Sequence, residues 1–315
     1  MRLDYAIEKY IDYRRSSGEK FESEARLLNV ISKSLGKGIV LSNISRQDCV
    51  NLLYGKAAKG DGISAYWFNL YAALNGLFKW ALARNYMDVN PLPPDKPRRP
   101  QSFVPYIYDR EELKLLFMNA MTYRKWFAKN HPEAIQGIIM LTYLLGLRPG
   151  ETLRIEMSDV HLGNENFILV KDTKFYKSRI VPFNDKVAEY LKNFLEWRIA
   201  EKLPLDPNAK LFLDQFGVPY SLSAMQKIFT NIRVKSNIFR YDGARYQPRL
   251  EDLRHTFATH RIVSWYREDK NVQDLLPVLS TYLGHGSINS TAVYITFTDE
   301  LLRKASDRFE SYLNL

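Results

Sequence analysis

The sequence is poor in cysteine and contains no long hydrophobic run. A single cysteine among 315 residues excludes an internal disulfide, and Cys49 lies among apolar neighbours, so we expect it to be a small core residue in a reducing environment. No run of about 18 apolar residues occurs, which argues against a membrane span. The chain also starts on a polar, periodic segment without the apolar stretch of a signal peptide. We therefore predict a cytoplasmic protein.

Positive charge is what the chain has in excess. The net charge is +10 and the pI is about 9.4, which favours a polyanionic partner. Residues 1–100 hold 16 Lys and Arg against 10 Asp and Glu, whereas the remainder holds 29 against 25. The first third is therefore the more basic part of the chain. We predict double-stranded DNA as the partner and association with the nucleoid.

Residues 1–90 are predicted to form a helical bundle. Apolar side chains recur with helical spacing over residues 3–11 and 27–35, and Gly36 suits the end of the second helix. A longer helix rich in aromatic residues is expected at about 63–85. Most of these aromatic side chains should lie in the bundle core, and a minority could face a nucleic-acid backbone.

Residues 91–105 are predicted to be a linker. Five prolines in its first ten residues remove amide donors and restrict the residues before them, which excludes a helix or a central strand. The segment also carries Lys96, Arg98 and Arg99. A basic, semi-extended spacer of this kind can follow a phosphate backbone. A solvated linker without any DNA contact is an equally good interpretation.

Residues 106–298 are predicted to form a second, mainly helical domain with a small β-sheet. Runs of apolar and β-branched residues at 167–170 and 178–182 bracket a short turn, which predicts a hairpin. An amphipathic segment at 299–315 ends the chain. Helices are expected at about 110–120, 135–145, 185–201, 221–236, 250–265, 271–283 and 287–296, and Asp109 suits the N-cap of the first of them.

His285 lies nine residues before Tyr294, downstream of Arg148 and Arg254, which both adjoin apolar segments. An oxygen nucleophile that attacks a phosphodiester needs fixed positive charge and hydrogen-bond donors around the phosphate. Arginine suits this task because its planar guanidinium donates two parallel bonds and stays charged. Tyrosine has an unperturbed pKa of about 10, which a cluster of cations lowers. The residue types together indicate phosphodiester chemistry.

The residues alone leave alternatives open for both arginines. Glu151, three residues after Arg148, could hold the guanidinium by an ion pair, or the two could be an ordinary surface pair worth a few tenths of a kcal/mol. Arg254 stands between Leu253 and a further apolar run, where a charge is either functional or extends past its neighbours to solvent.

Taken together, four segments resemble the motifs of the tyrosine recombinase/integrase family, in particular its Xer-type members. They occur in the family's order and the resemblance covers nearly the whole chain. The segments are residues 142–153 with the first arginine, 173–182 with a lysine at the hairpin, 252–260 with the second arginine, and 282–294 with the histidine and tyrosine.

The resemblance implies a role for each matched residue. Arg148 and Arg254 clamp the scissile phosphate, and His285 donates a hydrogen bond to it. Tyr294 attacks and forms a 3′-phosphotyrosyl bond, while Lys174 protonates the departing 5′-oxygen. Further roles are implied or suggested for neighbouring residues: Lys177 as the alternative to Lys174, Glu151 as support for Arg148, and Lys177 and Arg179 as DNA contacts.

One position departs from the family pattern. Members usually carry a histidine three residues before the second arginine, where it helps to move the tyrosine proton, but this chain has Glu251. A glutamate there could accept a proton, but it brings negative charge next to a phosphate unless Arg249 or Arg254 compensates. The alternative is that Glu251 points away and that water or another group accepts the tyrosine proton. His255 and His260 match packing positions of the family, so we expect both in the core.

The resemblance also implies an organisation and a set of partners. Residues 1–90 correspond to a core-binding domain, 106–298 to the catalytic domain, and 299–315 to a C-terminal helix that docks on a neighbouring protomer or on its own domain. The enzyme would act without metal or nucleotide, as a dimer on one site and a tetramer on two, and without an arm-binding domain. The alternatives are a DNA-binding protein with impaired catalysis and a relaxing enzyme like the type IB topoisomerases.

Overall fold

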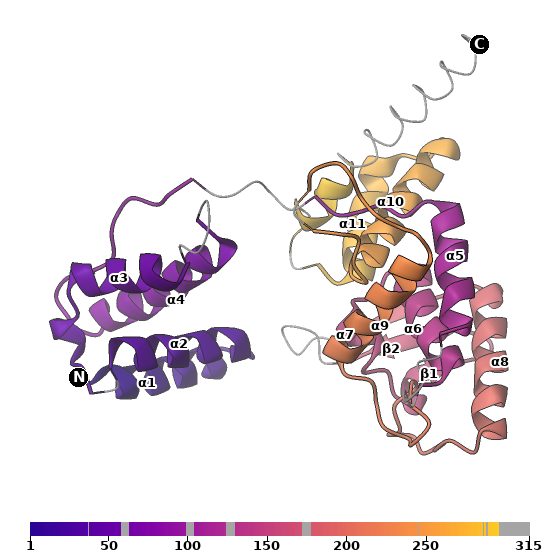
Figure 1. Cartoon of the computed structure of the whole chain (residues 1–315), viewed down its shortest axis with the longest axis horizontal. Coiled ribbons are helices and arrows are strands. Elements are labelled where there is room, and N and C mark those ends of the chain that lie inside the picture. The colour runs from indigo at the N-terminus through magenta and orange to yellow at the C-terminus, as the bar shows by residue number, and fades with distance from the viewer. Residues whose placement is uncertain are drawn as a thin grey trace, which may run out of the picture. The chain divides into compact units, whose positions relative to one another are not determined.

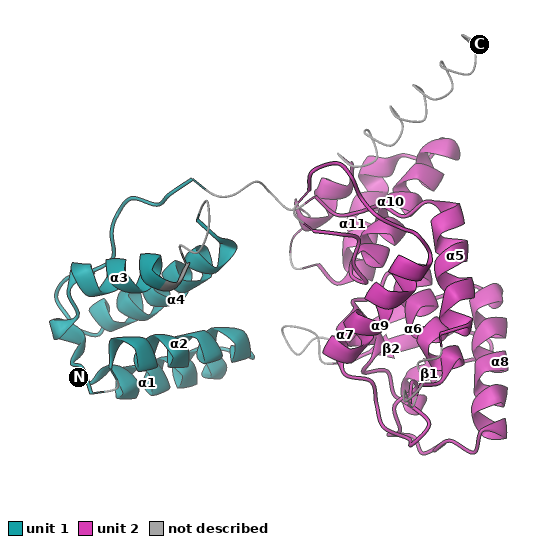
Figure 2. Ribbon diagram, in the orientation of Figure 1, with its two compact units in different colours: residues 1–103, 174–176 teal, residues 104–173, 177–315 magenta. Residues whose placement is uncertain are grey.

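The computed structural model describes residues 1–36, 38–57, 63–98, 104–123, 130–171, 178–244, 246–285, 287 and 289–295. These residues form two compact units that are divided along the sequence between residues 98 and 104 (Figures 1 and 2). Each unit encloses a hydrophobic core of its own. The predicted C-terminal helix at 299–315 lies outside the described residues.

The first unit is a helical bundle. Its helices are α1 (Leu3–Ser16), α2 (Glu22–Leu35), α3 (Arg46–Ala57) and α4 (Ala65–Leu82), with a short 3-10 turn η1 (Leu41–Asn43). Trp67 and Phe78 of α4 are fully buried, as is Cys49 of α3, which confirms the expected core positions. Tyr66 is among the aromatic residues that stay exposed.

The beginning of the predicted linker lies against this bundle. Described residues 91–98 have no regular secondary structure. The Tyr71 hydroxyl donates to the Pro93 carbonyl at 3.0 Å, and the Lys96 ammonium lies 4.7 Å from the centre of the Tyr71 ring. Arg98 is exposed, and Arg99 lies outside the described residues.

The second unit is mainly helical and holds a small antiparallel sheet, so the predicted fold class is confirmed. The elements are α5 (Arg110–Met121), α6 (Pro132–Leu144), α7 (Pro149–Thr152), η2 (Met157–Asp159), β1 (Val160–His161), β2 (Phe167–Val170), β3 (Arg179–Pro182), α8 (Asp185–Ala200), α9 (Leu222–Lys235), α10 (Asp252–Arg267) and α11 (Val272–Leu283). The sheet order is β1-β2-β3, and Val170 pairs with Arg179 at the hairpin end. Residues 289–295 are helical as well.

Local sequence explains where the helices begin and end. Asp109 accepts from the Glu112 backbone and Glu112 accepts from the Asp109 backbone, a capping box that starts α5. Helix α6 is buried along most of its length in the core and carries the segment that leads into α7. Gly284 ends α11 in the left-handed conformation, with φ 68°. Within the described ranges, no helix is both long and apolar enough to cross a membrane.

Candidate active site

Arg148 stands at the start of α7, directly after the buried segment that follows α6. Pro149 begins the turn, because proline suits the first helical position. The Arg148 backbone N–H donates to Glu151 Oε2 at 3.0 Å, and its Nη1 donates to Oε1 at 2.8 Å. Nη2 reaches the Gly284 carbonyl at 3.4 Å. The side chain is 44% exposed, so it is held from one side and open to a ligand from the other.

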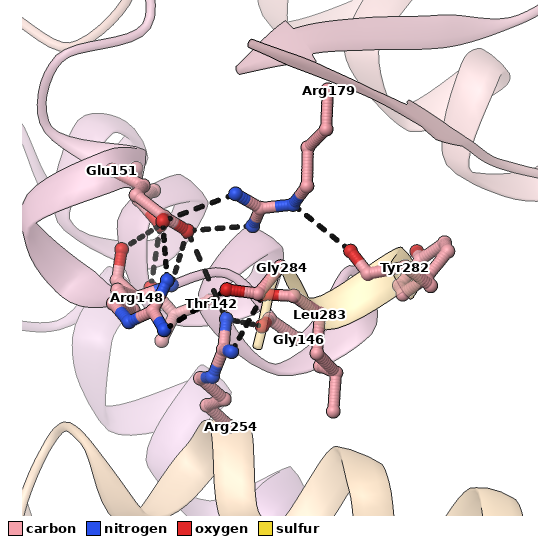
Figure 3. Close-up of polar contacts among 10 residues, drawn as sticks. Thr142, Gly146, Arg148, Glu151, Arg179, Arg254, Tyr282, Leu283 and Gly284 are labelled. Carbon is pink, nitrogen blue, oxygen red and sulfur yellow. Dashed lines mark hydrogen bonds and ion pairs between the residues drawn. The ribbon is translucent and has the colours of Figure 1, made fainter. Parts of the chain in front are cut away.

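Glu151 joins arginines from three separate segments (Figure 3). In addition to Arg148, its carboxylate accepts Nη1 of Arg179 at 3.1 Å and Nη2 at 2.8 Å, and Nη1 of Arg254 lies 3.8 Å from Oε2. The Glu151 side chain is only 3% exposed. The interpretation of Arg148 and Glu151 as an ordinary surface pair is therefore wrong.

The ionised form of Glu151 is strongly favoured in the folded protein. Burial by itself raises the pKa of this carboxyl, but the hydrogen bonds and charges of Arg179 and Arg148 outweigh burial and lower the pKa to about 2. Glu151 therefore stays charged throughout the neutral and mildly acidic range. It fixes its arginine partners while cancelling part of their positive charge.

A pH dependence of stability follows from this lowered pKa. The stabilisation by ionised Glu151 is complete above its ordinary pKa of 4.5 and is lost as the pH falls toward about 2. We expect Glu151→Gln to lower the free energy of unfolding by roughly 3 kcal/mol at pH 7, and the gap to the wild type to narrow as the pH falls below 4.5. Urea unfolding of both proteins between pH 7 and pH 3 measures this. A gap that stays constant over that range would contradict the assignment.

Arg254 lies in the first turn of α10 and is almost fully buried. Its Nη1 donates to the Gly146 carbonyl at 2.9 Å and its Nη2 to the Leu283 carbonyl at 2.7 Å. Burial and the charge of Arg148 lower its pKa to about 10, against the opposing effect of Glu151 and Tyr294. Arg254 is therefore still charged at neutral pH. Its guanidinium joins the end of the α6 segment to the end of α11, which contradicts the interpretation of an arginine that extends to solvent.

His285 follows the glycine that ends α11, and its backbone N–H donates to the Ser280 carbonyl at 3.0 Å. Its Nδ1 forms a 2.7 Å hydrogen bond with the Thr291 hydroxyl. Burial lowers the pKa of His285 to about 4, helped by the charges of Arg254 and Arg148. The imidazole is thus neutral at pH 7, and the Thr291 contact fixes its orientation.

Tyr294 is brought to the same place by the helical residues 289–295. Its side chain is 3% exposed, and its ring lies 6.1 Å from the His285 ring, nearly parallel at 24°. Burial raises the pKa of its hydroxyl, whereas Arg254 lowers it by charge and by a side-chain hydrogen bond, and Arg148 lowers it by charge. The proton is therefore retained at neutral pH in this state, beside the cations that favour its loss.

His255 is a site residue that the sequence interpretation placed in the core. Its ring is half-buried, and its centre lies 5.6 Å from the centre of the Tyr294 ring. Burial lowers its pKa to about 4, as do Arg254 and Arg249. His255 directly follows Arg254 in the sequence, and this adjacency is the signal that could have placed His255 near the site. The other expected core histidine, His260, is partly buried and pairs its Nδ1 with the Tyr143 hydroxyl at 3.1 Å.

Tyr282, a second tyrosine near the site, and Glu251, which stands in place of the family histidine, occupy different surroundings. The Tyr282 ring stacks on Phe257, and burial raises the pKa of its hydroxyl to about 12. Glu251 directly precedes α10, and its carboxylate accepts from Gln226 Nε2 at 3.4 Å. Arg249 pairs with Asp252 at 3.2 Å.

The structure thus brings together part of the predicted site. Arg148, Glu151, Arg254, His285 and Tyr294 converge, and they are joined by Arg179, which the sequence suggested as a DNA contact. Lys96 and Arg98 belong to the first unit. Lys174, Lys177 and Arg99 lie outside the described residues. Within the described part of the chain, no three histidine, cysteine or carboxylate side chains form a group that could hold a metal ion.

Sequence comparison identifies relatives over most of the chain. The model of the phage integrase family matches residues 109–300. A putative integrase/recombinase y4rE of Sinorhizobium fredii is 30% identical, with 97% of this chain and 95% of that protein covered. A tyrosine recombinase XerD of Staphylococcus saprophyticus is 28% identical, with 85% and 83% covered.

Comparison with solved structures gives the same fold. XerH site-specific recombinase bound to a palindromic difH substrate aligns with a TM-score of 0.66 and 21% identity, covering 98% of this chain and 96% of that one. A lambda integrase fragment, solved as a dimer bound to a core site, aligns with a TM-score of 0.64 and 16% identity, covering 91% and 96%. At these identities the likeness concerns the fold alone.

Proposed function

Because the chain belongs to the phage integrase family of tyrosine recombinases, we propose that it is a site-specific DNA recombinase. The observation that supports this most directly is the convergence of Arg148, Arg254 and His285 on Tyr294. The arrangement provides two guanidinium groups and a neutral imidazole around an oxygen nucleophile. This is the set of groups that attack on a phosphodiester needs.

In the proposed reaction, Tyr294 attacks the scissile phosphate. Its oxygen forms a bond to phosphorus while the bond to the 5′-oxygen breaks, which leaves a 3′-phosphotyrosyl linkage and a free 5′-hydroxyl. Arg148 and Arg254 hold the non-bridging oxygens, where negative charge increases in the transition state. Lys174 protonates the departing oxygen. The phosphodiester energy is kept in the new bond, so a 5′-hydroxyl from another strand can reverse the step without a nucleotide.

His285 and His255, both neutral at pH 7, have different roles in the proposed reaction. A Thr291 hydroxyl that donates to Nδ1 of His285 leaves the imidazole proton on Nε2, the form that donates to a phosphate oxygen. His255 lies beside the Tyr294 ring and is neutral at pH 7, because burial and the nearby arginines lower its pKa to about 4. At that pKa it is a weak base, and the negative charge of a bound phosphate would have to raise the pKa before His255 could take the tyrosine proton. We assign His255 as the acceptor of the Tyr294 proton in place of the family histidine that Glu251 replaces.

We further propose that both units bind DNA, which the enzyme meets in the cytoplasm. The helical bundle of residues 1–90 would contact the duplex backbone together with the basic linker at 91–105, which carries Lys96, Arg98 and Arg99. Lys177, at the hairpin, would do the same from the catalytic unit. A dimer on one site and a tetramer on two would allow strand exchange, with residues 299–315 packed on a neighbouring protomer.

Covalent capture from genomic DNA tests the proposal and at the same time reveals the target site. The protein is incubated with sheared DNA of its source organism, denatured in SDS, and the DNA that remains attached is sequenced. We expect one recurring sequence, joined through its 3′-phosphate to the peptide that contains Tyr294. Absence of any SDS-resistant adduct would favour a DNA-binding protein with impaired catalysis. Relaxation of supercoiled DNA without recombinant products would favour the topoisomerase-like alternative.

Glu251→His tests whether the unusual glutamate limits the rate. If His255 already accepts the Tyr294 proton, we expect the variant to change the single-turnover rate of cleavage on the captured site by less than about threefold. His255→Ala is the paired variant, and we expect it to lower that rate by about 10²-fold, a usual contribution of general base catalysis. A rise of tenfold or more in Glu251→His would assign the proton transfer to position 251 instead.

A further inference from the structure

Arg179 is the first residue of β3, and each of its donor nitrogens has a partner in the second unit. Nη1 and Nη2 grip the two oxygens of Glu151 at 3.1 and 2.8 Å, and Nε donates to the Tyr282 carbonyl at 2.9 Å. Figure 3 shows these contacts of Arg179 with Glu151 and Tyr282. The side chain is 11% exposed. The sequence suggested a DNA contact at this position, but three of the five N–H donors of this guanidinium are already bonded within the unit, and its side chain has little surface left for a phosphate.

The turn after α11 is shaped around the Arg179 guanidinium. Gly284 adopts φ 68°, a conformation that other residues take with strain. A Cβ at this position would also lie 3.0 Å from Nη1 of Arg179. The turn thus approaches the guanidinium as closely as only a glycine allows, and His285 is the next residue after it.

Arg179 therefore links three parts of the site that are distant in the sequence. It holds Glu151, which in turn holds Arg148 through the backbone and the side chain. It holds the end of α11, where the Leu283 carbonyl accepts from Arg254. It also stands at the base of the hairpin, opposite Val170 and five residues after Lys174 in the sequence.

We propose that Arg179 is a positioning residue for strand cleavage, which fixes the Arg148–Glu151 pair and the turn before His285 in the geometry that the phosphate needs. The inference rests on the proposed recombinase function. Arg179 acts through its neighbours, and the DNA is contacted by Arg148, Arg254 and His285.

The electrostatic consequence of this arrangement can be measured. The charged groups that face Glu151 are Arg148, Arg254 and Arg179, and Arg179 gives the largest of the effects that keep its pKa low. Without Arg179, burial is opposed by fewer charges and the pKa of Glu151 rises. Once Glu151 is protonated, it has no negative charge with which to hold the Arg148 guanidinium. Cleavage by a variant without Arg179 should therefore decline as the pH falls, over a range in which the wild type is unaffected.

The test measures DNA binding and cleavage separately, on the nicked duplex recovered by covalent capture. For Arg179→Met we expect a Kd within twofold of the wild type at each salt concentration and a single-turnover cleavage rate about 10- to 100-fold lower at pH 7. We expect this deficit to grow between pH 8 and pH 5.5. In the double variant Arg179→Met, Glu151→Gln the rate should stay low but lose its added pH dependence.

Two further variants separate positioning from a general loss of structure. Arg179→Lys keeps a cation but cannot grip both oxygens of Glu151, so we expect an intermediate rate with the fold retained, which far-ultraviolet circular dichroism checks. Lys171→Met removes a cation from the other side of the hairpin base, where it pairs with Asp159 at 2.6 Å, and should leave the rate unchanged.

Three results would overturn the inference. The first is a higher Kd for DNA together with an unchanged cleavage rate at saturating DNA. In that case the slope of log K against the logarithm of the salt concentration should also fall by about one, which is the behaviour of a direct phosphate contact. The second is a deficit that does not depend on pH. The third is a wild-type rate in Arg179→Met. A wild type that forms no adduct contradicts the recombinase function itself, so the two failures are distinguishable.

Discussion

Replacement of Tyr294 with phenylalanine is expected to abolish covalent attachment to DNA while the Kd for DNA stays within about twofold. The phenylalanine keeps the ring that packs beside His255 and His285 but removes the oxygen that attacks the phosphorus. Loss of a nucleophile lowers a rate by at least about 10⁴-fold. The measurement is the amount of SDS-resistant adduct formed on the captured site over a day at saturating protein.

Tyr282→Phe is the matched control for this prediction. It removes a second buried tyrosine hydroxyl from the same region and leaves the backbone carbonyl that accepts from Arg179 in place. We expect adduct formation at the wild-type rate. If Tyr294→Phe still forms an adduct and Tyr282→Phe does not, the nucleophile is Tyr282 and not Tyr294.

Arg254→Lys is expected to lower the single-turnover rate of cleavage by about 10²- to 10³-fold, the usual effect of removing one donor to a transition-state oxyanion. A lysine keeps the charge but has neither the planar fork nor the reach to serve the Gly146 and Leu283 carbonyls together with a phosphate. Those carbonyls would lose their partner in a buried place, so we also expect a loss of roughly 1–3 kcal/mol in the free energy of unfolding.

Arg261→Lys in the same helix is the control for Arg254→Lys. Arg261 is exposed two turns further along α10, and its guanidinium lies 5.8 Å from the centre of the Phe257 ring. We expect neither the cleavage rate nor the unfolding free energy to change beyond experimental error. Comparable losses in both variants would mean that α10 is simply intolerant of lysine, and the phosphate-clamping role of Arg254 would then lack support.

Much of the fold can be predicted from residue patterns. The patterns at residues 167–170 and 178–182 predict the hairpin strands, which are found as β2 (Phe167–Val170) and β3 (Arg179–Pro182). Asp109 is predicted to cap a helix and does so. These features depend on side-chain periodicity and on contacts a few residues apart, which the sequence shows directly. The two-residue strand β1 is not predicted, because so short a run carries no periodic signal.

The sequence by itself determined the family and, by resemblance, which residues are candidates for the chemistry, from Arg148 to Tyr294. Only the tertiary structure decided how some of them are used. Glu151 is a buried anion instead of half of a surface pair, and Arg179, which lies 28 residues further along the chain, donates two hydrogen bonds to it. His255, which the sequence places in the core, packs there against the ring of Tyr294. The physical reason is that spacing along one element fixes which side chains share a face, whereas long-range packing decides which faces meet. Arg254 and the Gly146 carbonyl that it binds are 108 residues apart, and no local pattern encodes their contact.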